Sequence, residues 1–368
     1  MTGERMTEGH LTEGHMTDER TTDERMSKLE SRYRRLLRVL PSWYRRDREE
    51  EMVDTLLSGR AEPNALDGRP GLAEAGAVLG LAVRTRLAGT GPARAVAVGN
   101  AVRLTALLGL LVSTGVAMGQ LAQLVIEQAW LRGGPFQPPA NRLVTDLVYV
   151  IGYLAVPGVC VAAVAGRRWP ARILALVALV PSGNAVLDLL RRAIHAGPLY
   201  WDPYAGGFIS TATLWVAVVC LWVGFHRAAP RPPAGWWRTA LALVVLGGLG
   251  WGVFCQLSPV DLGQDSLGRI LLDRNTMPTS AVIVLGVGYL FAAGLRRVDF
   301  SGSWALALAV SAVVLIPGQL AVLLATLRLD AVWTGFYIGQ LLALVVMTVS
   351  LVIMGGKKFR RIRPAGAG

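Results

Sequence analysis

Long apolar runs separated by short polar segments make up most of the chain beyond residue 100. Eight such runs lie near 104–127, 143–165, 172–190, 207–225, 239–257, 277–295, 303–326 and 333–354. An α-helix rises about 1.5 Å per residue, so each run is long enough to cross a hydrocarbon core about 30 Å thick. The pattern therefore predicts an all-α, polytopic membrane protein with eight transmembrane helices.

The eight runs divide into two similar halves, 103–225 and 238–354. At an offset of 136 residues, Gln120-Leu121 aligns with Gln256-Leu257, Gly152-Tyr153-Leu154 with Gly288-Tyr289-Leu290, and Pro181 with Pro317. Self-similarity at a fixed period is the signature of a duplicated structural unit. Each half holds an even number of predicted spans. We therefore expect two parallel four-helix repeats, related by an axis along the membrane normal.

The segments outside the apolar runs predict smaller cytoplasmic elements. Residues 1–26 carry a tandem five-residue repeat without an apolar face, which is typical of a disordered tail. Residues 27–67 place apolar side chains at helical spacing on both sides of Pro41, and predict a small cytoplasmic helical module. Residues 70–100 predict a juxtamembrane helix at the cytoplasmic membrane face. Residues 355–368 predict a basic cytoplasmic tail.

The helical module carries a longer motif, RYRRLLRVLPSWYRRDREEEM, from Arg32 to Met52. This motif resembles the N-terminus of a group of actinobacterial multi-pass membrane proteins. Those proteins carry the all-helical HAAS-like signalling module, which is associated with PadR-type transcription regulators. The resemblance spans residues 30–90. It implies a signalling or regulatory role and a regulator protein as partner through residues 27–60, and it implies no catalytic residue.

Composition and charge support the membrane interpretation. Hydrophobic residues make up 53% of the 368 residues and the mean hydropathy is +0.44, values that exclude an ordinary soluble protein. The net charge of +12 comes from basic residues near the ends of the apolar runs, which favours contact with membrane lipids over direct nucleic-acid binding. The arginine-rich connecting segments predict the cytoplasmic side, so we expect a multi-pass protein of the cell membrane with both termini cytoplasmic.

The cysteines and histidines offer no ligand pattern. Cys160, Cys220 and Cys255 lie within apolar runs, without the spacing of a metal site or a redox pair. We therefore predict neither a metal site nor any other cofactor.

Polar side chains inside the apolar runs are the candidates for ligand binding, because a polar group in hydrocarbon is costly unless it has a partner. They lie toward the outer halves of the predicted spans, some of them close to bends expected at Pro181 and Pro317. The ligand-binding candidates are Gln120, Gln123, Tyr153, Asn184, Gln256, Tyr289 and Gln319. Together they predict a polar vestibule, open to the outer leaflet near the repeat interface, that accepts a lipid or a small hydrophobic molecule.

Helix packing offers a second interpretation of the polar and small residues. Amides at such positions also bond neighbouring helices to one another, and carboxylates near span ends pair with arginines at the membrane edge. Glycines four residues apart predict close helix contacts of the same structural kind. The glycine pairs are Gly115 and Gly119, Gly248 and Gly252, and Gly335 and Gly339.

Three functions remain open from the sequence. The signalling resemblance favours a sensor or regulatory membrane protein that binds its ligand in the vestibule. One alternative is an intramembrane enzyme that acts on a lipophilic, isoprenoid-like substrate, for example an acid-catalysed cyclase, because an apolar cavity raises the pKa of a carboxyl group enough for general acid catalysis. Its candidate catalytic residues are Glu127, Asp146 and Asp188. The other alternative is a transporter or permease subunit, since duplicated bundles with bent spans are common in transporters.

Overall fold

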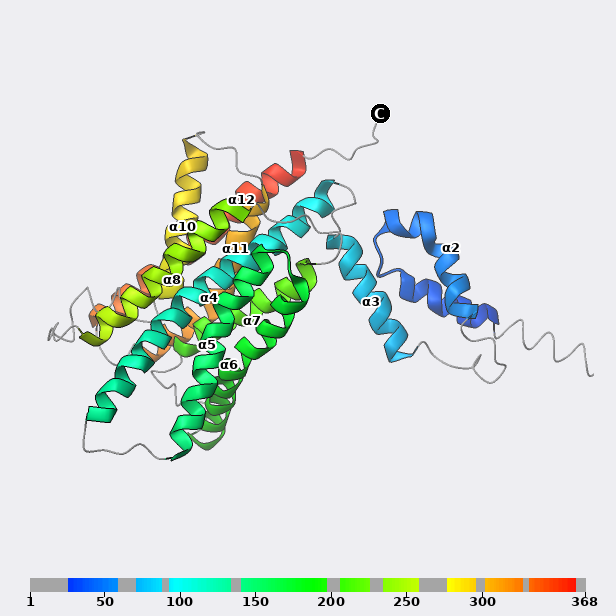
Figure 1. Ribbon diagram of the computed structural model, residues 1–368. Coiled ribbons are helices and arrows are strands. Elements are labelled where there is room, and N and C mark those ends of the chain that lie inside the picture. Colours follow the sequence, from blue (N-terminus) through cyan, green and yellow to red (C-terminus); the bar gives the residue numbers. More distant parts are fainter. Residues whose placement is uncertain are drawn as a thin grey trace, which may run out of the picture. The chain divides into compact units, whose positions relative to one another are not determined.

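The structure is a computed structural model that describes residues 26–58, 71–87, 93–133, 140–196, 206–225, 234–257, 277–295, 302–326 and 331–361. The described residues are helical apart from a few turn positions. The chain divides into two compact units, an N-terminal unit within residues 1–91 and a membrane unit within residues 92–368 (Figure 1). The predicted tail at 1–26 lies outside the described residues apart from Met26.

Three helices form the described part of the N-terminal unit: residues 26–37, α2 (Ser42–Ser58) and α3 (Leu72–Leu87). Pro41 separates the first two, because proline lacks the amide hydrogen that a helix interior needs. Leu37, Leu40, Val53, Val78 and Ala82 form a shared core. The helix α3 supplies Val78 and Ala82, so the segment expected along the membrane surface also packs on the two helices before it.

The described part of the membrane unit consists of α4 (Ala93–Gly133), α5 (Ala140–Val164), α6 (Arg168–Ala196), α7 (Gly206–Gly224), α8 (Ala234–Leu257), α10 (Met277–Gly294), α11 (Gly302–Thr326) and α12 (Ala331–Arg361). Five of these, α4, α5, α8, α11 and α12, are long and apolar enough to cross a membrane. The helices α7 and α10 hold shorter apolar stretches, Thr211–Gly224 and Pro278–Gly294. The chain is therefore a membrane protein with several apolar helices, and the full count of eight spans stays a prediction.

The helix α4 lies at the centre of the membrane unit, in contact with α5, α7, α8, α10 and α11. Its contact with α8 depends on two pairs of glycines. A Cβ added at Gly248 would meet the carbonyl oxygen of Gly115, and one added at Gly252 would meet that of Gly119. The contacts follow the same order along both helices, so α4 and α8 run parallel. The predicted helix contact of these two glycine pairs is confirmed.

The third glycine pair behaves differently. A Cβ added at Gly335 or Gly339 of α12 would meet nothing within 4 Å in the part of the chain that the structure describes. The predicted contact is therefore not found among these residues. Both glycines are exposed on α12.

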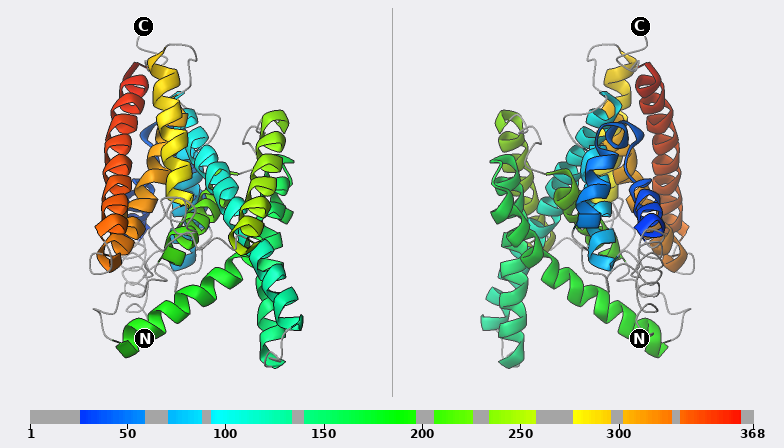
Figure 2. Two further views of the ribbon diagram at one scale, coloured as in Figure 1. Left: turned by 90° about the vertical axis from the view of Figure 1, so that its left-hand side faces the viewer. Right: turned by 90° about the vertical axis from the view of Figure 1, so that its right-hand side faces the viewer.

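The helices α10, α11 and α12 pack against one another, and α11 also contacts α4 and α7 (Figure 2). By contrast, α8 packs on α4 and α5, so it joins the helices of the first half. In the first half, α5 and α7 each contact both α4 and α6. The two halves are therefore interleaved around α4, and their arrangement as two equivalent four-helix repeats stays a prediction.

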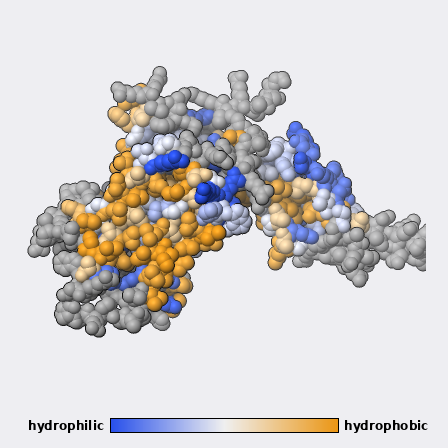
Figure 3. Space-filling model, in the orientation of Figure 1, coloured by the Kyte–Doolittle hydropathy of each residue, from blue (hydrophilic) through white to orange (hydrophobic). Residues whose placement is uncertain are grey.

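Several contacts bring the starts of α4, α6 and α11 together with the ends of α5 and α7 at one end of the membrane unit. The Ser303 hydroxyl donates to the Ala97 carbonyl oxygen at 2.9 Å, and a Cβ at Gly224 would lie 3.2 Å from Cγ of Arg103. The turn between α5 and α6 lies beside Phe225 at the end of α7. We call this the basic end, defined by Arg103, Arg167, Arg168, Arg172 and Arg238. Figure 3 shows a broad apolar surface over the visible face of the membrane unit, with hydrophilic residues near its margins.

Candidate functional site

A chain of hydrogen bonds links α10, α11 and α12. The Thr279 hydroxyl donates to the side-chain oxygen of Gln319 at 3.2 Å, and the Gln319 amide nitrogen donates to the side-chain oxygen of Gln340 at 2.8 Å. The Gln340 amide nitrogen in turn donates to the Ser280 hydroxyl at 3.0 Å. Buried polar groups are costly without partners, and these four residues, which we call the amide network, supply partners for one another.

Within the amide network, Gln319 of α11 joins α10 to α12. Its side chain has no exposed surface, and it donates one hydrogen bond and accepts another across helix boundaries. This geometry matches the interpretation of such amides as bonds between helices. Sequence reasoning did not place Thr279 and Ser280 among the candidates. Their signal was present, since they are adjacent hydroxyl residues at the start of an apolar run.

A second polar contact joins α4 to α5. The Gln128 amide nitrogen donates a short hydrogen bond to the Asp146 carboxylate, and both side chains are half-buried. Glu127, the residue before Gln128, is exposed. Tyr149 and Tyr153 follow Asp146 on α5, with ring centroids 5.9 Å apart. Asp146 thus combines a carboxylate, a bonded amide and nearby tyrosines, which is a set able to orient a polar ligand group.

The remaining candidates with described side chains are spread over several helices. Gln120 and Gln123 on α4 are half-buried, and Asn184 on α6 is exposed. Tyr289 on α10 is buried at 6% exposure. The side-chain hydrogen bonds of the amide network and of the α4–α5 contact join different helices, so a single vestibule shared by all candidates stays a prediction.

Two candidates, Asp188 in α6 and Gln256 in α8, have side chains outside the described residues.

The helix α6 continues through Pro181, and a Cβ added at Gly152 of α5 would overlap the ring of that proline. Pro181 cannot bond the carbonyl four residues earlier. This local weakening of α6 coincides with its close packing on α5.

A glycine turn sets the geometry of the basic end. Gly166 has φ of 73°, in the left-handed region that favours glycine, and it lies in the turn that follows α5, one residue after Ala165. Its amide donates to the Ala163 carbonyl at 3.1 Å, while the Arg167 amide donates to the Ala162 carbonyl at 2.8 Å. These two bonds form the Schellman arrangement that ends many helices. The chain therefore reverses within a few residues, and α6 begins at once with Arg168.

Arg172, one turn into α6, reaches the end of α7. One terminal guanidinium nitrogen lies 3.4 Å from the Trp222 carbonyl oxygen and 3.5 Å from that of Phe225. The guanidinium carbon lies 5.1 Å from the centroid of the Trp222 ring, within cation–π range. A cation is favourable at a helix C-terminus, where unpaired carbonyl groups carry partial negative charge. Arg172 thus fixes the end of α7 against the start of α6.

Arg103 on α4 is the most deeply buried arginine of the basic end, with 6% exposure. Its Nε and one terminal nitrogen have no hydrogen-bond partner among the described residues. Sequence reasoning missed Arg103, Arg172 and Gln128 as partners of other helices. The signal for Arg103 was its position directly before a long apolar run, where a charge needs a protein partner or the membrane surface.

Within the described residues, no group of three or more histidine, cysteine, aspartate or glutamate side chains is arranged to hold a metal ion. Comparison with protein-family models, with curated proteins and with solved structures finds no match. The function is therefore inferred from the residues and their geometry.

Proposed function

We propose that the protein is a sensor or regulatory component of the cell membrane, in which the N-terminal unit transmits the state of the membrane unit to a protein partner. The observation that carries this proposal is the division of the chain into an apolar helical unit and a separate helical unit with its own core. The HAAS-like resemblance of residues 30–90 supports a signalling role for the second of these.

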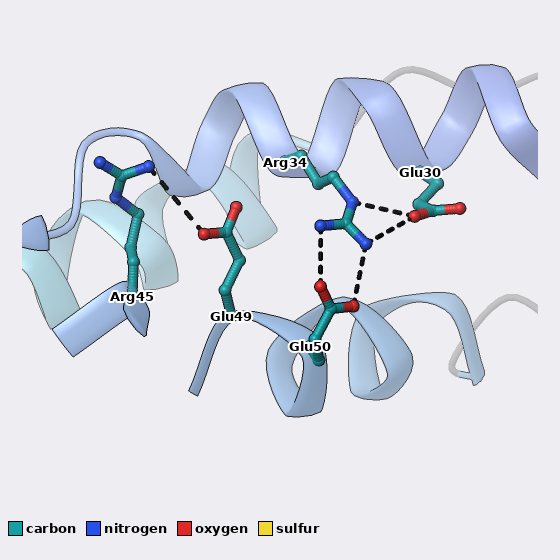
Figure 4. A network of polar contacts seen from close by, with 5 residues as sticks. All are labelled: Glu30, Arg34, Arg45, Glu49 and Glu50. Carbon is teal, nitrogen blue, oxygen red and sulfur yellow. Dashed lines mark hydrogen bonds and ion pairs between the residues drawn. The ribbon is translucent and has the colours of Figure 1, made fainter. Parts of the chain in front are cut away.

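Polar contacts tie the three helices of the N-terminal unit to one another. Arg34 bonds Glu30 on its own helix and Glu50 on α2, with N–O distances of 2.9 Å (Figure 4). Hydrogen bonds to Glu50 and Glu30 raise the pKa of Arg34 above its ordinary value. The Tyr33 hydroxyl donates to Glu74 of α3 at 3.0 Å. A unit joined in this way presents a defined surface to a partner, which we expect to bind through residues 27–60.

The charge distribution supports a cytoplasmic N-terminal unit. Basic residues gather where α4 begins, where α5 meets α6 and where α7 ends. Cytoplasmic segments of membrane proteins carry an excess of lysine and arginine. We therefore infer that the basic end faces the cytoplasm, as does residue 93 at the start of α4.

The position of α4 supports a path for the signal. We propose that a lipid or small hydrophobic ligand binds near Gln120, Gln123 and Asp146, toward the end of α4 opposite the basic end. A ligand shifts a conformational equilibrium only if it binds two arrangements unequally. Because α4 contacts α5, α7, α8, α10 and α11, a change in its packing alters its contacts with these five helices.

The test measures transcript profiles in cells that carry the full chain, no chain, or one of two variants. Leu37→Asp places a charge in the core of the N-terminal unit, where Leu37 has no exposed surface. Leu72→Asp is the matched control, because Leu72 is 94% exposed. We expect Leu37→Asp to reproduce the transcript changes of the deletion, with Leu72→Asp matching the wild type. The proposal would be refuted if the Leu37→Asp variant gave the transcript profile of the wild type. This outcome is decisive when the variant and the wild type are present in the membrane in equal amounts and the deletion itself changes the profile.

A further inference from the structure

We propose that Arg168 and Arg172 of the basic end bind the phosphate of an anionic phospholipid at the junction of α5, α6 and α7. This site lies at the end of the membrane unit opposite Gln120 and Asp146, so the inference goes beyond the proposed function. A small, partly open cavity marks the place. Its lining residues are Ala163, Gly166, Arg168, Ala171, Arg172, Leu221 and Phe225.

Positive charge converges on this cavity from three sources. Arg168 and Arg172 lie one turn apart on α6, and like charges at this spacing repel each other. Both belong to the first turns of α6, where the helix macrodipole is also positive. Arginine in this position opposes the dipole instead of complementing it. A bound anion would relieve both unfavourable interactions, and phosphate matches the planar fork of a guanidinium group.

The geometry of Arg172 leaves hydrogen-bonding capacity for such an anion. Its contacts with the carbonyl oxygens of Trp222 and Phe225, at 3.4 and 3.5 Å, are at the long limit of a hydrogen bond. Its Nε is buried and has no partner among the described residues. A phosphate oxygen in the cavity would give these donors a stronger acceptor. The Trp222 ring below the guanidinium group would keep it in place.

Apolar surface beside the cavity identifies the phosphate as part of a lipid. On α6, Trp169, Ile173 and Leu176 are exposed at helical spacing and begin next to Arg168. On α7, Val219 and Trp222 are exposed and lead to the same cavity. Tryptophan is favoured at the boundary between headgroups and acyl chains. The two apolar strips would thus contact the acyl chains while the arginines bind the headgroup phosphate.

The test uses the full chain in detergent, with equal amounts of phosphatidylglycerol and phosphatidylcholine, and detects retained lipid by native mass spectrometry. We expect the wild type to retain phosphatidylglycerol preferentially. Loss of charge-assisted hydrogen bonds lowers such an affinity by about tenfold or more. We therefore expect that loss for the double variant Arg168→Gln/Arg172→Gln. The control Arg238→Gln/Lys357→Gln removes two exposed charges outside the cavity, and it should keep the preference.

A thermal-shift measurement keeps the proposal testable if Arg172→Gln disturbs the end of α7. Phosphatidylglycerol should raise the melting temperature of the wild type and of the control variant, and should raise that of Arg168→Gln less. Inorganic phosphate should have no comparable effect. The proposal is overturned if the wild type shows no lipid preference, if the cavity variants keep it, or if inorganic phosphate stabilises the protein as much as the lipid does.

Discussion

Replacing Gly252 with valine tests the packing of α8 on α4. A Cβ at this position would lie 2.8 Å from Cβ of Ala122 and would also meet the carbonyl oxygen of Gly119. Carbon atoms in ordinary contact are about 3.5–4.0 Å apart, so the two helices would have to separate locally by roughly 1 Å. The additional methyl groups of valine increase this displacement.

The expected loss in the free energy of unfolding is large for a single substitution. Extra methyl groups forced into a packed interface lower that free energy by about 1–3 kcal/mol. Only 11% of the apolar stretch of α8 is buried within the chain, compared with 56% of the apolar stretch of α4. The contact with α4 therefore supplies much of what holds α8 in place, and we expect a cost toward the upper part of that range.

Gly250→Val is the matched control, because it lies on the same helix and an added Cβ there would meet nothing within 4 Å in the described structure. The free energy of unfolding of each variant can be measured by denaturant titration of the full chain in mixed micelles. We expect Gly250→Val to match the wild type and Gly252→Val to be destabilised. Equal effects of the two substitutions would refute the inferred contact.

The remaining predictions concern three polar groups. Gln319→Leu should lower the free energy of unfolding by about 1–3 kcal/mol, because Gln340 loses a buried partner. Adding Gln340→Leu should cost less than the sum of the single losses, and an additive result in denaturant titration would contradict the direct bond. Arg34→Met should weaken the N-terminal unit at low ionic strength, with a smaller difference at high salt because its ion pairs are exposed. Urea titration at two salt concentrations checks this, and a loss independent of salt would argue against it. Arg103→Met should leave thermal stability in detergent unchanged or raise it, since buried donors without partners are removed; a lower melting temperature would count against this.

The helices themselves could be predicted well from the sequence because helix length and apolar composition are local properties. The run predicted at 143–165, for example, corresponds to α5, Ala140–Val164. The predicted break at Pro41 and the glycine contacts between α4 and α8 also depend on residues that force one geometry. Such residues are informative because few conformations accept them.

The choice of neighbours could not be predicted in the same way. In a membrane, lipid-facing and protein-facing residues are both apolar, so composition does not show which face packs. The repeat offset of 136 residues makes Gly115 equivalent to Trp251. The residue of α8 that Gly115 contacts is instead Gly248. Likewise Gly152 packs on Pro181, but a Cβ at the aligned Gly288 would meet nothing within 4 Å among the described residues.

The polar candidates show the same limit. Their residue types identified Gln319 and Asp146 as groups that need partners, and both have them. The partners, Gln340 and Gln128, depend on how α12 and α4 lie beside α11 and α5. Sequence spacing does not contain that information.

The pairing of α4 with α8 has a consequence for biosynthesis. The ribosome completes α4 more than a hundred residues before it reaches Gly252. Throughout that interval the backbone at Gly115 and Gly119 faces lipid or the insertion machinery instead of its final neighbour. The nascent chain must therefore keep α4 accessible while α5, α6 and α7 are inserted. The native contacts of α4 are completed only after α8, α10 and α11 have emerged.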